Sequence, residues 1–261
     1  MNRIAECFEL KRQKGQKALI PYMMGGYPTL PDSAAALEIL AEAGADLIEV
    51  GVPFSDPLAD GPVIQAAGQQ ALANGCTLDR LMKELGPVVK GLPVPAVMMV
   101  YYNIIYQRGI RRFVEEIRDN GFAGLIVPDL PPEEAEELQK AGLECGIGLS
   151  FLVAPTSTPQ RIATASRCST GFIYAVSLKG VTGARDHLPP DLPEFLQRIR
   201  SQSDKPVAVG FGIAQPWQGQ TVAQMADGII VGSAVIQRMA GENGLKEAGM
   251  FLREMRQAID R

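Results

Sequence analysis

The chain has 261 residues, of which 46% are hydrophobic and 21% are charged, and its formal net charge at pH 7 is −4. These values describe an ordinary globular protein that is long enough to bury a substantial core. The acidic balance excludes a general electrostatic attraction to nucleic acid or to anionic membranes. An anionic substrate must therefore be bound by local donors rather than by the overall field of the protein.

The N-terminus and the cysteines favour a reduced, cytoplasmic protein. Charged residues stand near the start, where a secretory signal would have its apolar segment, and no apolar run reaches the length of a membrane span without a charge or a breaker. The four cysteines are scattered without a Cys-x-x-Cys pair, which argues against a zinc site and a disulfide framework. With His187 as its single histidine, the sequence offers neither a metal cluster nor a Ser-His-Asp triad.

Strands and helices alternate along the chain. An amphipathic helix over residues 2–14 comes first. The strands that we predict cover residues 18–24, 47–50, 96–101, 124–127, 147–153, 172–177, 206–209 and 228–231. The helices between and after them cover residues 32–43, 62–74, 77–89, 108–120, 132–141 and 158–168, a segment ending near 201, segments beginning at 216 and 232, and residues 245–259. Asp32 with Ser33, Thr77 and Thr158 are the expected helix caps.

This alternation predicts an α/β protein with a parallel sheet. Eight strands, each followed by a helix, in 261 residues fit a single (β/α)8 TIM barrel over residues 1–261. The barrel would carry an extra N-terminal helix and a short phosphate-binding helix after the last strand. A doubly wound open sheet is the alternative, although it usually has fewer strands. The longest connections, 53–61 and 178–190, follow strands, on the face where barrels perform chemistry.

Two carboxylates of one short segment are candidates for acid–base chemistry. Glu49 stands among the apolar residues of the second strand, and burial of an ionised carboxylate is costly unless it is paired. Asp60 follows eleven positions later, on a loop that can fold back over the barrel mouth. Apolar surroundings would raise the pKa of Glu49, so that it could deliver as well as accept a proton. The spacing alone equally allows a buried Glu bonded to backbone and a surface Asp.

Glycines follow the last three predicted strands. They are Gly180 and Gly183 after the sixth strand, Gly210 and Gly212 after the seventh, and Gly232, with Ser233, after the eighth. Glycines let backbone N–H groups approach an oxyanion, and barrels frequently bind phosphate at the loops after strands seven and eight. We therefore predict a phosphate site here. The aromatic residues near strand ends are either pocket lining or plain core, and they are Tyr22, Tyr101, Tyr102, Tyr174 and Phe211.

The motifs together resemble those of the tryptophan synthase alpha subunit family over essentially the whole chain. The most specific motif covers residues 48–62, Ile-Glu-Val-Gly-Val-Pro-Phe-Ser-Asp-Pro-Leu-Ala-Asp-Gly-Pro. Segments 127–131, 172–174, 180–183, 210–213 and 232–234 follow in the order of the family and at close to its spacing.

The resemblance implies a carbon–carbon lyase that cleaves indole-3-glycerol phosphate to indole and glyceraldehyde 3-phosphate in tryptophan biosynthesis. By this resemblance Glu49 protonates indole C3, Asp60 bonds the indole N–H, and Tyr174 lies beside them. Thr182 would bond Asp60 when the sixth loop closes. The residues implied to bind phosphate are Gly183, Gly212, Gly232 and Ser233, and those implied to surround indole are Tyr22, Ile64, Val100, Tyr102, Ile126 and Phe211.

The resemblance also implies a partner, the tryptophan synthase beta subunit, in an alpha2-beta2 heterotetramer. Pyridoxal phosphate would belong to that partner, and this chain would have no cofactor of its own. The loop over residues 53–60 would lie at the contact. Three alternatives stay open at this point: a stand-alone lyase that releases free indole, another barrel acting on a phosphorylated indole or ribose precursor, and a non-catalytic relative that only activates the beta subunit.

Overall fold

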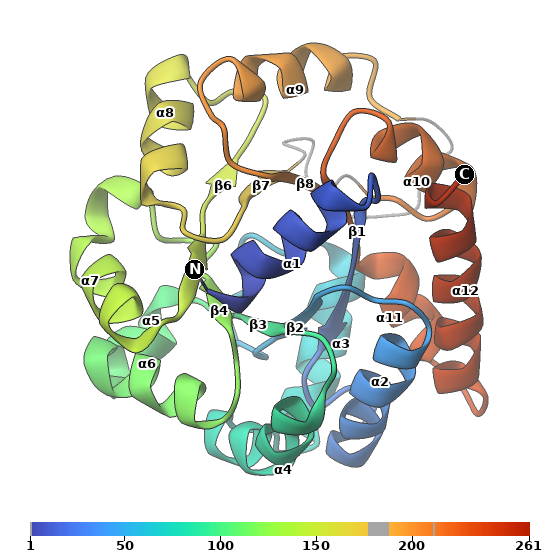
Figure 1. Cartoon of the computed structure of the whole chain (residues 1–261). Coiled ribbons are helices and arrows are strands. Elements are labelled where there is room, and N and C mark those ends of the chain that lie inside the picture. Colours follow the sequence, from blue (N-terminus) through green and yellow to red (C-terminus); the bar gives the residue numbers. More distant parts are fainter. Residues whose placement is uncertain (1, 177–187, 211) are drawn as a thin grey trace.

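A ring of parallel strands surrounded by helices is the architecture of this protein (Figure 1). The computed structural model describes residues 2–176, 188–210 and 212–261. The strands are β1 (Ala18–Met24), β2 (Ile48–Gly51), β3 (Ala96–Met99), β4 (Gly124–Ile126), β5 (Gly148–Ser150), β6 (Leu152–Val153), β7 (Ile173–Val176), β8 (Val207–Gly210) and β9 (Gly228–Val231).

The helices cover the outside of the ring, except for the first. They are α1 (Arg3–Gln13), α2 (Leu30–Glu42), α3 (Pro62–Ala73), α4 (Leu78–Gly91), α5 (Tyr102–Arg108), α6 (Ile110–Asp119), α7 (Glu136–Cys145), α8 (Pro159–Cys168), α9 (Leu192–Arg200), α10 (Pro216–Ala223), α11 (Ser233–Met239) and α12 (Gly244–Ile259), with a 3-10 turn over Pro132–Glu134. Within the described residues, none of these helices has the length and apolar character needed to cross a membrane.

One extended segment closes the sheet into a barrel. The strand order is β5-β4-β3-β2-β1-β9-β8-β7-β6, and every pairing is parallel. Its two ends, β5 and β6, are consecutive in the chain and are separated only by Phe151. The predicted strand 147–153 is thus a single interrupted strand that pairs with β4 through its first half and with β7 through its second. The TIM barrel is confirmed, and the open doubly wound sheet is wrong.

Three helix boundaries differ from the sequence-based prediction. Helix α2 begins at Leu30, because the Thr29 side chain accepts from the Asp32 N–H and acts as the cap in place of Asp32 and Ser33. The helix predicted over 108–120 is observed as α6, which begins at Ile110, and α5 before it was not predicted; Gly109, with a φ of +87°, separates the two. The one predicted over 132–141 is a 3-10 turn followed by α7. The caps at Thr77 and Thr158 are confirmed.

Helix α1 closes the N-terminal end of the barrel (Figure 1). Its buried residues Ile4 and Phe8 pack on Phe172 and other interior side chains, and the rings of Phe8 and Phe172 are 5.4 Å apart. A Cβ at Gly124 would stand 2.2 Å from Ile4 Cδ1, and one at Gly228 would stand 3.2 Å from Phe8 Cε1. Glycine at these strand positions therefore leaves space for the helix. Ligand access is left to the opposite, C-terminal end.

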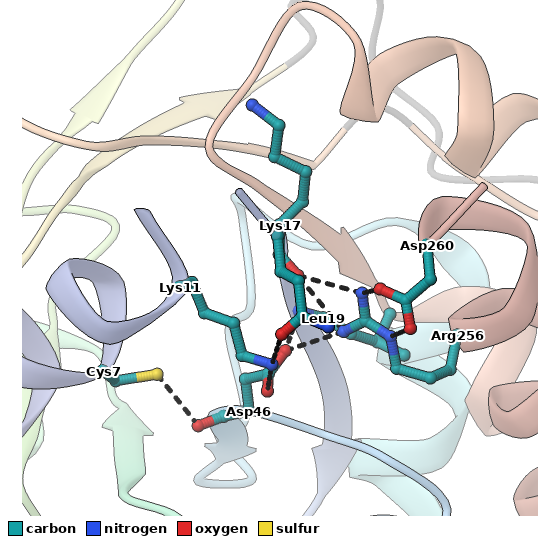
Figure 2. A network of polar contacts seen from close by, with 8 residues as sticks. Cys7, Lys11, Lys17, Leu19, Asp46, Arg256 and Asp260 are labelled. Carbon is teal, nitrogen blue, oxygen red and sulfur yellow. Dashed lines mark hydrogen bonds and ion pairs between the residues drawn. The ribbon is translucent and has the colours of Figure 1, made fainter. Parts of the chain in front are cut away.

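Asp46 joins the first and last helices beside this closed end (Figure 2). Its carboxylate accepts from Leu19 N at 2.9 Å, from Lys11 Nζ on α1 at 2.5 Å and from Arg256 Nη1 on α12 at 2.8 Å. Arg256 also donates to the Lys17 carbonyl at 3.1 Å. These side chains are 11–20% exposed, so the pairs are screened less than surface ion pairs and stabilise the closed end of the barrel.

Candidate active site

Three polar side chains meet inside the barrel near its C-terminal end. Tyr22 on β1 and Glu49 on β2 are register partners, and Tyr174 reaches them from β7. The Tyr174 hydroxyl donates to Glu49 Oε2 at 3.5 Å, which is at the long limit for such a bond. All three residues are buried. The structure therefore brings together the predicted acid and the predicted tyrosine from strands that are 125 residues apart in sequence.

Glycines at the neighbouring strand ends make room for the two tyrosine rings. A Cβ at Gly51 would stand 2.1 Å from Tyr22 Oη, and a Cβ at Gly210 would stand 2.8 Å from Tyr174 Cε1. Real Cβ atoms do not approach other atoms so closely, so any larger residue would displace a ring. These two glycines thus position the side chains around Glu49.

Glu49 is a buried carboxyl group with one oxygen left without a partner. Its exposed fraction is 0%, and its Oε1 makes no hydrogen bond among the described residues. Burial, and then the charge of Asp60, raise the pKa of Glu49 to about 8, against a smaller opposite effect of the Tyr174 hydrogen bond. A pKa of about 8 favours the protonated group at neutral pH. This state is the one that a general acid needs.

Asp60 is held at the site by Tyr101. The Tyr101 hydroxyl accepts from the Ala59 N–H at 3.0 Å, and its ring stacks on Phe54 at 5.0 Å, so both ends of the loop pack on one side chain. Burial raises the pKa of Asp60 to about 6, against a lowering effect of the hydrogen bond with Tyr101. Asp60 is thus largely ionised at neutral pH while Glu49 is protonated. Two carboxyl groups with separated pKa values can divide the roles of acid and electrostatic stabiliser between them.

Several other predicted residues lie around this pair. Ile126 packs in the same interior cluster as Tyr174, and Ile64 is buried on α3, the helix that follows the Asp60 loop. Gly232 lies against Tyr22, because a Cβ on it would meet Tyr22 Cβ at 3.4 Å. Ser233, the next residue, is buried at the start of α11. Ile126 thus shares a cluster with Tyr174, and Gly232 adjoins Tyr22.

The alternation of the extended segment favours Met99 and Tyr101 over the predicted Val100 and Tyr102. Val100 belongs to the larger apolar cluster, whereas Met99 packs against both that cluster and the interior one. Tyr102 begins α5, and its N–H donates to Asp129 Oδ1 at 2.8 Å. Side chains along an extended segment alternate between its faces, so the interior positions are the odd ones, and Tyr101 is the tyrosine at the site. The period-2 pattern from residue 97 onward would have identified Tyr101.

The predicted phosphate loop after β8 is described in part. Gly212 has a φ of +70°, a conformation that favours glycine. The turn after it is held by the buried Gln218 of α10, whose Oε1 accepts from the N–H groups of Ala214 and Gln215 at 2.8 and 3.0 Å. Gln218 was not among the predicted residues, although a Gln at the third position of a helix is a capping-box signal. Thr182, Gly183 and Phe211 lie outside the described residues.

Metal-binding groups are not found in the part of the chain that the structure describes. No three His, Cys, Asp or Glu side chains there are arranged to hold an ion. All four cysteines are free, and burial together with the charge of Asp46 raises the pKa of the Cys7 thiol to about 12.

Comparison with known proteins gives a consistent result. The family described as tryptophan synthase alpha chain matches residues 8–260. The tryptophan synthase alpha chain of Rippkaea orientalis is 46% identical over 266 residues, which cover 99% of this chain and 98% of the relative. The chain belongs to the tryptophan synthase alpha chain family.

Solved structures of the family agree with the fold. A structure of Mycobacterium tuberculosis tryptophan synthase has a TM-score of 0.92 at 39% identity and covers 99% of this chain and 98% of that chain. Tryptophan synthase subunit alpha from Legionella pneumophila also has a TM-score of 0.92, at 35% identity, and the match covers 100% of this chain and 99% of that chain.

Membership of the tryptophan synthase alpha chain family confirms the activity that the sequence motifs implied. The chain is a lyase of the alpha reaction in tryptophan biosynthesis. Nothing in the comparisons favours the free-indole alternative. The family has no cofactor of its own and implies a beta-subunit partner and a small-molecule substrate.

Proposed function

We propose that Glu49 and Asp60 together cleave indole-3-glycerol phosphate by a retro-aldol step. Glu49 is the general acid and base, Asp60 stabilises positive charge, and Tyr174 holds Glu49 in place. The observation that carries the proposal is the full burial of Glu49 beside Tyr174, with Oε1 unbonded among the described residues; this burial raises its pKa to about 8. A proton held in a dry site is available only to a group that enters the site.

The reaction follows from these protonation states. Glu49 transfers its proton to indole C3, and the ring gains a positive charge at its nitrogen. The Asp60 carboxylate accepts a hydrogen bond from the ring N–H and stabilises that charge. The hydroxyl group on the adjacent side-chain carbon then loses its proton to the Glu49 carboxylate. The carbon–carbon bond breaks, its electron pair returns to the ring, and indole and glyceraldehyde 3-phosphate leave while Glu49 is protonated again.

The substrate contacts are part of this proposal. Tyr22, Ile64 and Ile126 would line the indole pocket, with Tyr101 and Met99 in place of Tyr102 and Val100 on geometric grounds. Gly212, Gly232 and Ser233 would bind phosphate through main-chain amides, as strand-end glycines of barrels do. For Thr182, Gly183 and Phe211 the support is the family resemblance alone.

The assembly that we propose is an alpha2-beta2 heterotetramer in the cytoplasm, with pyridoxal phosphate held only by the beta subunit. Each alpha chain would be one TIM-barrel domain over residues 1–261, which is supported by the continuous sheet and by the family match over residues 8–260. The 53–60 loop would meet the partner. Leu58 on this loop is 94% exposed, as expected of an apolar side chain that becomes buried against a partner.

A turnover assay with and without beta subunit tests the function. The full chain is incubated with indole-3-glycerol phosphate, and indole and glyceraldehyde 3-phosphate are quantified. Low activity alone with strong stimulation by the beta subunit supports the proposal. High activity alone would indicate a stand-alone lyase, and no cleavage in either setting would indicate a non-catalytic activator.

A further inference from the structure

Gln65 on α3 makes two hydrogen bonds to the loop that carries Asp60. Its side-chain Nε2 donates to the carbonyl oxygen of Asp60 at 2.9 Å and to that of Pro57 at 3.4 Å. Gln65 is half-buried, and its own N–H donates to the Gly61 carbonyl at 2.9 Å as part of the first helical turn. The side chain is thus fixed to a rigid helix at one end and to the loop main chain at the other.

The loop has few other tethers at this point. Gly61, the residue before α3, has no side chain with which to cap the helix. The described main chain near Asp60 is held by its own N–H to the Pro57 carbonyl at 3.0 Å and by Tyr101, which bonds Ala59. Tyr101 therefore bonds the loop at Ala59 from the barrel side. Gln65 bonds it at Asp60 from helix α3.

We infer that Gln65 is a positioning residue that fixes the main chain of Asp60 so that the carboxylate points into the barrel. This inference rests on the proposed function, because it acts through the role given there to Asp60. Without the Gln65 bonds, Asp60 samples positions that are more hydrated and farther from the reacting ring. Displacements of about 1 Å are enough to cost large factors in rate.

Gln65→Met removes the donor and keeps the length and the helix propensity of the side chain. We expect kcat to fall about tenfold with KM changed less than about twofold, because a misplaced group lowers transition-state binding more than ground-state binding. Gln65→Glu also lacks the donor, and its kcat should fall at least as far. Thermal melting should be unchanged within about 2 °C, which would separate positioning from lost stability.

Gln70→Met is the matched control. Gln70 lies on the same helix, and its amide also donates to a loop carbonyl, that of Pro28 at 3.3 Å, but this loop does not carry Asp60. The control should retain wild-type kcat. A kcat for both Gln65 variants within twofold of wild type, or an equal loss in Gln70→Met, would overturn the inference.

A double-mutant cycle and a pH profile separate this inference from the proposed function. Asp60→Asn should lower kcat by about 10²–10⁴-fold, and adding Gln65→Met to it should cost almost nothing further, because both changes act on one group. In Gln65→Met alone, the acid limb of kcat/KM should move to lower pH as Asp60 becomes better hydrated. If Asp60→Asn is fully active, the proposed function fails. If Asp60→Asn is impaired and the two losses multiply, only the role of Gln65 fails.

Discussion

Asp46 and Glu49 are carboxylates only three positions apart, and their surroundings in the barrel are opposite. Asp46, at the closed end, accepts hydrogen bonds from one main-chain N–H and two cations. Glu49, at the open end, has a single long bond from Tyr174 and a bare oxygen among the described residues. Both are buried or nearly so, and both come from the same short stretch around β2.

The contrast separates a structural carboxylate from a reactive one. A buried carboxylate that is fully paired stays ionised and stabilises the fold, whereas one that is left unpaired becomes a proton donor at some cost in stability. The closed end of the barrel therefore contributes rigidity, and the open end holds the group to which we assign the acid–base role.

The largest expected effect is on activity at the open end. Glu49→Gln preserves shape but removes the proton, so kcat should fall by at least about 10³-fold while substrate still binds. The free energy of unfolding should stay the same or rise, because a desolvated acid has been removed. Single-turnover kinetics and urea unfolding of the same preparations measure both. Retained turnover would remove Glu49 from the mechanism.

At the closed end the expected effect is on stability. Asp46→Asn leaves Lys11 and Arg256 without their shared partner, and the free energy of unfolding should fall by about 2–3 kcal/mol with kcat changed less than about twofold. The exposed Asp119, paired with Arg118 at 2.8 Å, is the matched control, and Asp119→Asn should cost less than about 1 kcal/mol. A loss of activity in Asp46→Asn without a loss of stability would break the comparison.

A smaller effect is expected in the dependence of kcat/KM on pH. Cleavage needs Asp60 ionised and Glu49 protonated, so kcat/KM should be bell-shaped, with limbs near the pKa values of about 6 and about 8 and a tenfold fall per pH unit outside them. Because the two groups interact, the limbs belong to the pair. A rate that stays flat to pH 9 would contradict the raised pKa of Glu49.

The raised pKa of Glu49 also predicts the direction in which the free energy of unfolding changes with pH. Folded Glu49 keeps its proton up to about pH 8, whereas the unfolded chain loses it near the ordinary value of 4.5. Between these values the native state binds more protons, so the stability contributed by Glu49 falls as pH rises from about 4.5 to about 8. Wild type should lose stability relative to Glu49→Gln over this window. Parallel stability curves for the two proteins would refute the assignment.

Much of this arrangement was predictable from local pattern. The first strand is observed at the predicted residues 18–24, and Glu49 stands out because an acid interrupts an apolar strand. Helix α5 was not predicted, and Gly109 was placed inside the next helix, although its positive φ ends α5. The choice between Tyr101 and Tyr102 depends on a different signal. Both tyrosines follow β3, and the period-2 pattern from residue 97 onward favours Tyr101.

By itself, the sequence determined the order of strands and helices, the parallel barrel and the two acids, because periodicity and charge are properties of neighbouring residues. Tertiary structure alone decided that Asp46 has two cationic partners while Glu49 has only Tyr174 among the described residues. It also decided that Gly51 and Gly210 give space to Tyr22 and Tyr174, and that Gln65 reaches the Asp60 loop. The physical reason is that pKa and position depend on what surrounds a group. Those surroundings come from strands and helices that meet only when the barrel closes.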